Sequence, residues 1–151
     1  MVLTPQLFKM GRALPGTLMK LGMSERWFFG QADEGLAEVH LENHVIICGY
    51  GPVGGHVSCV LQENEIPYLV LDLNASRIRS LQEKGIPAYY GDSSSSEVLI
   101  HAGIKRARAV VVTYADPYAA RRTVSQAKIL QPIALVLALT RLPEDIAELR
   151  R

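Results

Sequence analysis

A strand, a tight turn and the start of a helix are packed into residues 44–54, whose sequence is HVIICGYGPVG. Residues 45–48 form a continuous apolar run, which is typical of a parallel strand buried on both faces of its sheet. Gly49, Gly51 and Gly54 follow with the spacing G-x-G-x-x-G. In such a turn the first glycine permits the sharp bend, the second lets the backbone approach a pyrophosphate, and the third permits close packing of helix on strand.

The residues around these glycines suit the start of a helix. Pro52 would occupy the first helical position, where its missing N–H costs no hydrogen bond and its fixed φ is already helical. Backbone N–H groups at a helix start, together with the helix dipole, favour a bound phosphate. The predicted phosphate-binding turn therefore consists of Gly49, Tyr50, Gly51, Pro52, Val53 and Gly54.

A second apolar run, residues 68–71, ends in Asp72. Asp72 stands 21 residues after Gly51, close to the spacing of about 20 at which a ribose-binding acid is expected. A carboxylate there accepts hydrogen bonds from both ribose hydroxyls and repels a 2′-phosphate. The alternative for an isolated aspartate is a solvated turn residue before Asn74, but the agreement of strand, glycines and spacing favours nucleotide binding.

Strands and helices alternate along the remainder of the chain. The predicted strands are residues 44–49, 68–72, 87–90, 107–113 and 134–140. The predicted helices are residues 52–64, 75–84, 94–102 and 117–130, with another beginning near Pro143. Asn74 suits a helix N-cap, and Gly85 and Gly103 suit helix C-termini. Strands separated by helices of about ten residues predict right-handed crossovers, and hence an α/β fold with a Rossmann-like, doubly wound parallel sheet and helices on both faces.

Polar residues also follow the third and fourth predicted strands, at the edge where ligands of open α/β sheets bind. Asp92 and Ser93 come after the third strand, where Asp92 could accept a hydrogen bond from an adenine amino group or a ribose hydroxyl. The alternative for Asp92 is a cap-like role before the next helix. Thr113 ends the fourth predicted strand and Tyr114 follows it, and both would flank the adenosine or the pyrophosphate. Asp116 comes next and equally suits the cap of the helix after it.

Composition limits the other classes of protein. The chain of 151 residues has the length of about one domain, and its 48% hydrophobic and 21% charged residues exclude a disordered or fibrous chain. A net charge of +1 indicates no nucleic-acid partner, and the basic spots at 105–108 and 121–122 are expected to be solvated. No signal peptide is expected from the first residues, and no apolar run reaches the roughly eighteen residues that cross a bilayer.

The cysteines and histidines predict neither a metal site nor a catalytic thiol. Cys48 belongs to the first strand and Cys59 to the following helix, and both are expected to be inert core thiols. No CxxC pair and no Cys/His cluster is present in the sequence. His56, just after the glycine turn, would either approach a phosphate or occupy a partly exposed helix position. The other histidines are scattered without ligand spacing: His40, His44 and His101.

Residues 1–40 differ from the rest of the chain. Basic residues alternate there with apolar ones, and glycines and a proline interrupt any long helix. Two interpretations stay open, the cytoplasmic end of a membrane helix followed by an interfacial linker, or an irregular arm packed on the domain or on a partner chain. The predicted division is an arm over 1–40 and a nucleotide-binding domain over 41–151.

Five segments together resemble the TrkA-N domain, also called RCK or KTN, which is the cytoplasmic regulatory domain of bacterial potassium channels and transporters. The resemblance covers residues 44–151. Its segments are GYGPVG, LVLDLN, YYGDSS, AGIKRARAVVVTYADP and ALTRLPEDIAELRR. Residues 1–10 are in addition similar to the end of the last membrane helix of Kef-type cation/proton antiporters.

This resemblance implies a ligand, NAD(H) or an adenine nucleotide such as AMP, ADP or ATP, and a homodimer that gates a linked potassium channel or cation/proton antiporter. It implies that residues 49–54 hold the phosphate and that Asp72 binds the ribose. Further implied contacts are Leu73, Arg77, Asp92, Ser93, Thr113 and Tyr114. Many members carry a basic residue inside the glycine turn, where this chain has Pro52, Val53 and Gly55, which weakens any claim on a second phosphate. The sequence ends at Arg151, where members continue into a crossover helix, so the usual exchanged dimer is expected to be incomplete.

An enzyme would use the same turn for its cofactor. An NAD-dependent oxidoreductase also needs a substrate pocket and a proton donor beside the nicotinamide, and residues after 140 are too few to supply a substrate domain. We therefore expect no catalytic residues, and the resemblance implies a regulatory domain at the cytoplasmic face of the bacterial inner membrane. The alternatives are a fragment of an oxidoreductase and a nucleotide-binding subunit without a membrane partner.

Overall fold

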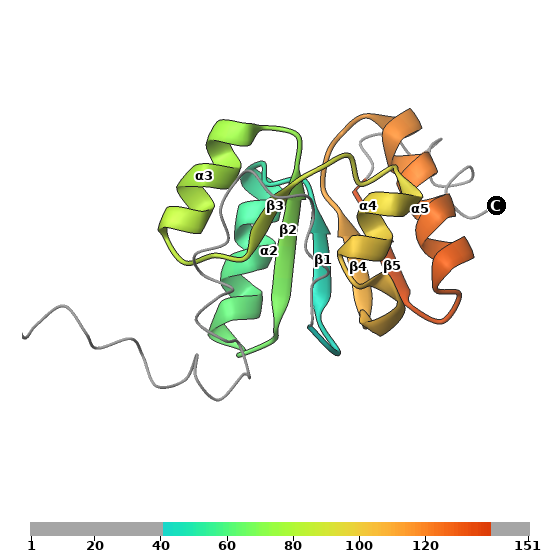
Figure 1. Cartoon of the computed structure of the whole chain (residues 1–151), viewed down its shortest axis with the longest axis horizontal. Helices are drawn as coiled ribbons and strands as arrows, with labels where there is room; N and C mark the ends of the chain where they lie inside the picture. Colours follow the sequence, from blue (N-terminus) through green and yellow to red (C-terminus); the bar gives the residue numbers. More distant parts are fainter. Residues whose placement is uncertain (1–40, 140–151) are drawn as a thin grey trace, which may run out of the picture. The chain divides into compact units, whose positions relative to one another are not determined.

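The computed structural model describes residues 41–139. Five parallel strands form one sheet in the order β3-β2-β1-β4-β5 (Figure 1). The strands are β1 (Val45–Cys48), β2 (Tyr68–Asp72), β3 (Ala88–Tyr90), β4 (Ala109–Val112) and β5 (Leu135–Ala138). The helices are α2 (Pro52–Glu63), α3 (Ala75–Glu83), α4 (Ser96–His101), the short 3₁₀ helix η2 (Ile104–Arg106) and α5 (Pro117–Leu130).

The strand order confirms the predicted doubly wound sheet. From the central strand β1 the chain proceeds outward to β2 and β3, then crosses back to β4 on the other side of β1 and continues to β5. The carboxyl ends of β1 and β4 are therefore neighbours, paired in register up to Cys48 and Val112. This reversal of direction is the topological switch point, at which open α/β sheets bind their ligands.

Helices cover both faces of the sheet, as predicted (Figure 1). On one face Ile47 and Val70 pack in a core with Ile78 and Leu81 of α3 and with residues of α2. Alternate residues of a strand point to opposite faces, so Ile46 and its equivalents are buried against the other face, where α4 and α5 contact each other. Every residue of β1 and β2 is buried, which explains why both strands are apolar almost throughout.

The predicted element ends are confirmed where local chemistry sets them. Pro52 stands in the first turn of α2, and the Asn74 side chain caps α3 by accepting from the Arg77 N–H. Gly85 and Gly103 both have a φ of 73°, which suits glycine at a helix end.

Two predicted boundaries were wrong by a few residues. The helix predicted over 94–102 begins only at Ser96, because the preceding residues form a turn in which Ser95 N–H donates to the Asp92 carbonyl. The strand predicted over 107–113 begins at Ala109, after η2. The arm over 1–40, the end of the fifth predicted strand and the helix from Pro143 lie outside the described residues.

The two cysteines differ in burial. Cys48 is completely buried, and this burial raises the pKa of its thiol to about 12. Cys59 is exposed on α2, so its predicted place in the core was wrong. The apolar positions of α2 that pack inward are Val57 and Leu61, and Cys59 falls between them on the outer side of the helix.

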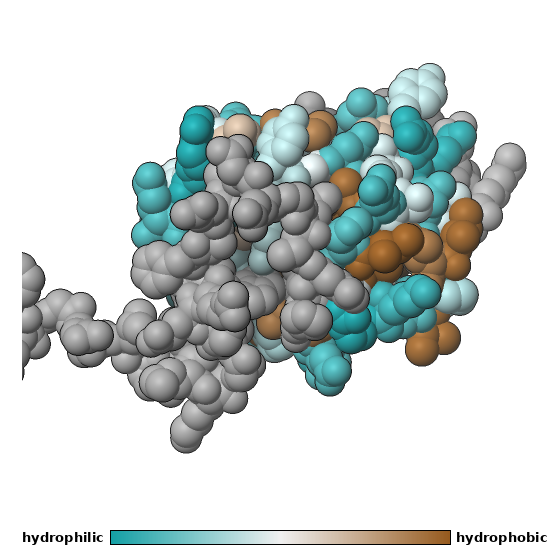
Figure 2. Space-filling model, in the orientation of Figure 1, coloured by the Kyte–Doolittle hydropathy of each residue, from teal (hydrophilic) through white to brown (hydrophobic). Residues whose placement is uncertain are grey.

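Apolar side chains are exposed at the β5 side of the molecule. Leu135 is 57% exposed and Leu137 50%, in contrast to the buried residues of β1. Ile129 of α5 and Ile133 in the loop before β5 are also exposed. Figure 2 shows apolar surface at the end of the described domain where α4, α5 and β5 lie.

Candidate nucleotide-binding site

The three glycines of the turn have different structural roles. Gly49 has a φ of 94°, and a Cβ at Gly54 would lie 2.2 Å from the Gly49 carbonyl oxygen, so both positions require glycine within the fold itself. A Cβ at Gly51 would meet no heavy atom within 4 Å. Space is therefore left in front of Gly51, at the position where the predicted site needs close approach of a pyrophosphate to the backbone.

A threonine from the neighbouring strand holds this turn in place. The Thr113 hydroxyl donates to the Gly49 carbonyl at 2.7 Å and lies 3.2 Å from the Cys48 carbonyl. Thr113 directly follows β4, so the contact joins the two strands that flank the switch point. The structure thus places the hydroxyl of the predicted site residue Thr113 against the glycine turn, where it binds backbone carbonyls of the turn.

The start of α2 faces the same edge of the sheet. Its N-cap is Gly51, whose lack of a side chain leaves the first turn uncapped, and no acidic residue lies in that turn. Uncapped N–H groups and the positive end of the helix dipole form an anion-binding site. His56 is exposed on α2 with its Nδ1 2.6 Å from the Pro52 carbonyl, which agrees with the predicted exposed helix position.

Asp72 is buried at the carboxyl end of β2 and directed toward the glycine turn. Its Oδ2 accepts from the Tyr50 backbone N–H at 2.7 Å and from the Arg77 guanidinium at 2.9 Å, and its Oδ1 accepts from the Asn74 N–H at 2.8 Å. A carboxylate has roughly four lone-pair positions, so about one remains. Two ribose hydroxyls therefore bind only if one protein donor withdraws, and Arg77, with a 42% exposed side chain, is the donor least held by its surroundings.

The charge of Asp72 is stabilised in spite of its burial. Burial alone would raise the pKa of this carboxyl, but the hydrogen bonds from Tyr50, Asn74 and Arg77 outweigh it and hold the pKa below its ordinary value of 3.8. The predicted contacts Asp72 and Arg77 are thus brought together as an ion pair beside the turn. Leu73 follows with an exposed side chain.

A group of hydroxyls forms the other half of the site, on the β4 side. The Tyr114 hydroxyl makes a hydrogen bond with the Thr123 hydroxyl of α5 and lies 3.3 Å from the Ser93 hydroxyl. It also donates to the Ala119 carbonyl at 3.4 Å. Burial raises the pKa of Tyr114, so the phenol stays neutral. The predicted residues Ser93 and Tyr114 therefore lie together, although 21 positions separate them in the sequence.

The sequence did not single out Thr123 as part of this group. It is completely buried on the inner side of α5, between Ala120 and Ala127. The sequence signal for a buried hydroxyl there is a threonine that stands at helical spacing between two alanines. Such a residue is common in helices, so only its neighbours in space identify its partner.

The two remaining aspartates take part in turns. Asp92 is exposed, and its Oδ1 accepts from the Ser94 N–H at 2.9 Å, which is the cap-like role left open for it. Contact of Asp92 with an adenine stays a prediction. Asp116 caps α5 by accepting from the N–H groups of Tyr118 and Ala119, as the second of its two predicted roles required.

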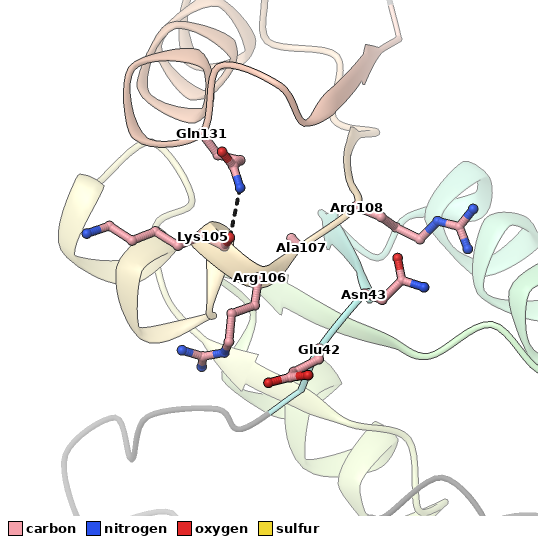
Figure 3. Close-up of a pocket in the computed structure, with 7 residues that line it drawn as sticks. All are labelled: Glu42, Asn43, Lys105, Arg106, Ala107, Arg108 and Gln131. Atoms are coloured by element: carbon pink, nitrogen blue, oxygen red, sulfur yellow. Dashed lines mark hydrogen bonds between the residues drawn. The ribbon is translucent and has the colours of Figure 1, made fainter.

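A hollow of about 350 Å³ lies at the opposite edge of the sheet, where the strands begin (Figure 3). The Gln131 side chain donates to the Lys105 carbonyl there at 2.7 Å. The hollow contains none of the predicted site residues, and its lining is Glu42, Asn43, Lys105, Arg106, Ala107, Arg108 and Gln131. Close by, His44 is buried with its Nε2 donating to the Ala102 carbonyl, and burial lowers its pKa. The basic spot at 105–108 thus borders a wide depression at the amino edge.

Two further searches of residues 41–139 were negative. None of the helices in this part of the chain is both long and apolar enough to span a bilayer. No group of three His, Cys, Asp or Glu residues within it is arranged to hold a metal ion.

Known proteins share both the sequence pattern and the fold. The chain is 37% identical over 111 residues to a KefB-like K(+) efflux antiporter of Alkalimonas amylolytica, a match that covers 74% of this chain and 17% of that protein. The crystal structure of the TrkA-N domain of the inner membrane protein ybaL from Escherichia coli superposes with a TM-score of 0.71 at 26% identity, covering 74% of this chain and 83% of that one. The AMP-bound Kef C-terminal domain of Shewanella denitrificans is 30% identical, with a TM-score of 0.56, and the match covers 64% of this chain and 57% of that one.

The chain spans less than a fifth of the antiporter it matches, so the likeness concerns one domain. The family model of the TrkA-N domain matches residues 45–151, a range that begins at β1 and includes the glycine turn, Asp72 and the hydroxyl group around Tyr114. With this match and its doubly wound sheet, the chain belongs to the TrkA-N domain family.

Proposed function

We propose that this chain binds NAD(H) or an adenine nucleotide at the carboxyl edge between β1 and β4, and that occupancy of this site regulates a linked potassium or cation/proton transporter. The observation that supports this best is the position of Asp72, which donors hold as a carboxylate beside the open Gly51. A ribose on Asp72 and a phosphate at the start of α2 would use both features. The AMP held by the similar Kef domain points to the same class of ligand.

The proposed role is regulatory, and the nucleotide would be bound without being consumed. A ligand shifts a conformational equilibrium only by its different affinity for the two states, and no chemical step is needed for that. The similar proteins are an efflux antiporter and an inner membrane protein, which supports a transporter as partner and the cytoplasmic face of the bacterial inner membrane as location. An NAD-dependent oxidoreductase is the competing function.

Calorimetry on the whole chain tests this proposal. AMP and NADH should bind, and Gly51→Val should abolish binding without lowering the melting temperature, because its Cβ has space in the free protein but occupies the position of the phosphate. Retained affinity in folded Gly51→Val would place the ligand elsewhere. Steady oxidation of NADH that depends on a small-molecule substrate and disappears in Gly51→Val would establish the oxidoreductase instead.

A homodimer is also part of the proposal. It is supported by the exposed apolar side chains around β5, since exposed apolar patches mark protein interfaces. Sedimentation velocity should show a dimer for the wild type and a shift toward monomer for Leu137→Glu. Val60→Glu, at a similarly exposed apolar position of α2, is the matched control. Equal behaviour of the two variants would exclude the β5 side as the interface.

A further inference from the structure

We propose that Tyr114 makes this site selective for an adenine mononucleotide, AMP or ADP, over a dinucleotide. The inference rests on the proposed nucleotide function and goes further, because it chooses between ligands that share the same adenosine half. It depends on where the ring of Tyr114 lies, what holds it there, and which half of a dinucleotide has to pass it.

The ring lies at the switch point itself. A Cβ at Gly49 would be 3.1 Å from Cδ1 of Tyr114, so the ring is in contact with the first residue of the glycine turn. Tyr114 comes two residues after β4, which pairs with β1 directly. The ring therefore stands between the carboxyl ends of the two strands on which the halves of a dinucleotide are distributed.

The groups that recognise a nucleotide lie on one side of this ring only. Asp72 is the last residue of β2, and the open backbone at Gly51 precedes α2. The protein groups that would bind the ribose and the phosphate therefore all lie on the β2 side of the turn. The β4 side holds the hydroxyls of Ser93, Tyr114 and Thr123, and these bond to one another. An adenine mononucleotide needs only the binding groups on the β2 side. A second nucleoside has to extend over the β4 side.

The ring is held in place by its hydroxyl. Thr123 is completely buried and Ser93 nearly so, and both reach the Tyr114 oxygen, as does the Ala119 carbonyl. These contacts come from α5 and from the loop after β3. Moving the ring aside would leave the buried hydroxyl of Thr123 without this partner, which opposes the movement. A mononucleotide therefore leaves this ring in place, whereas a dinucleotide has to displace a tethered side chain.

Calorimetry with AMP, ADP and NAD on the whole 151-residue chain tests the inference. The wild type should bind AMP or ADP at least ten times more tightly than NAD. Tyr114→Ala should reduce that ratio tenfold or more by raising the affinity for NAD relative to AMP. Tyr114→Phe, which keeps the ring and loses its tether, should reduce the ratio less than alanine does. Tyr118→Ala is the control, because Tyr118 is 79% exposed on α5 and should leave the ratio unchanged.

Either of two results would overturn the selectivity. One is NAD binding to the wild type as tightly as AMP, a comparison that needs no variant and so still decides if Tyr114→Ala fails to fold. The other is a folded Tyr114→Ala that still binds AMP and has an unchanged ratio of AMP to NAD affinity. If the folded wild type binds none of the three ligands, the proposed nucleotide function fails and the selectivity fails with it, which is distinguishable from AMP binding without preference.

Discussion

The two halves of the carboxyl edge are built from different chemistry. On the β2 side a buried carboxylate, a guanidinium and an uncapped helix start surround an open backbone position at Gly51. On the β4 side neutral hydroxyls and an aromatic ring satisfy one another. The first half combines an open backbone position with a partly exposed donor, Arg77, that can withdraw, whereas the second is closed by contacts among buried side chains. Although β2 and β4 both lie beside β1, their carboxyl ends therefore do not form two equivalent subsites for a ligand.

Thr113 connects these halves. Its hydroxyl comes from the β4 side and donates to the Gly49 carbonyl on the glycine turn. A Cβ at Gly54 would clash with the same carbonyl oxygen. The geometry of the open half therefore depends on one hydroxyl of the closed half, and variants at these positions test how separable the two halves are.

The largest effect is expected from Gly54→Ala. Its Cβ would lie 2.2 Å from the Gly49 carbonyl oxygen, so the turn or the helix has to shift, at a cost of about 1–3 kcal/mol in the free energy of unfolding. Urea denaturation measures this cost. Gly51→Ala is the control, because its Cβ meets nothing within 4 Å, and equal stability of the two variants would contradict the separate roles assigned to these glycines.

Asp72→Ala should weaken AMP binding by about 1–3 kcal/mol, because the ribose hydroxyls would lose a charged acceptor. Calorimetry compares it with Asp92→Ala. Asp92 is exposed and already engaged with the Ser94 N–H, so its loss should matter less. A larger effect at Asp92 would shift the recognition of the nucleotide away from the end of β2.

Thr113→Val should destabilise the fold by about 1 kcal/mol, since the Gly49 carbonyl loses its hydroxyl donor. Thr113→Ser keeps the hydroxyl and is the control. If the two halves are coupled as the contact suggests, AMP affinity should fall in the valine variant and stay near wild type in the serine variant. Unchanged AMP affinity in the valine variant would show that the glycine turn on the β2 side keeps its geometry without the Thr113 hydroxyl.

Lowering the pH should reduce the contribution of Asp72, on the β2 side, to the free energy of unfolding. The folded pKa of Asp72 lies below 3.8, so the ionised carboxylate stabilises the fold fully above that pH, and this contribution is lost as the pH falls through the folded pKa. The difference in unfolding free energy between wild type and Asp72→Asn should therefore shrink as the pH is lowered below 3.8. A difference that stayed constant down to the acid unfolding of the chain would show that the charge of Asp72 adds no stability.

The smallest effect on stability is expected from Arg77→Ala, at most about 0.5 kcal/mol, because its ion pair is partly exposed. Its effect on selectivity should be clearer. Arg77 offsets the charge of Asp72, so its removal should increase the preference for NADH over NADPH, which competition binding measures. Arg79→Ala on the same helix is the control. An unchanged preference would mean that Arg77 does not influence the position of a 2′-phosphate.

Much of the fold was predictable because its signals are local. The apolar run of β1, the glycine at the turn after it and Pro52 each suit the local backbone conformation or burial at their own position. The structure confirms all three. The boundaries of α4 and β4 were less accurate, since Asp92 and η2 compete with the regular elements for the same residues. Cys59 was misplaced because an apolar residue type does not report which side of its helix faces the core.

Spacing along the chain determined the strand, the turn and the acid of the β2 side, because these lie within one βαβ unit whose geometry is repeated wherever that unit forms. Only the tertiary structure decided the β4 side. Ser93, Tyr114 and Thr123 come from two loops and a helix, and they meet because parallel strands bring their carboxyl ends to one edge while a crossover carries the chain over it. No local pattern encodes such a meeting, since the contact depends on how the strands are ordered in the sheet and on which side of α5 faces it.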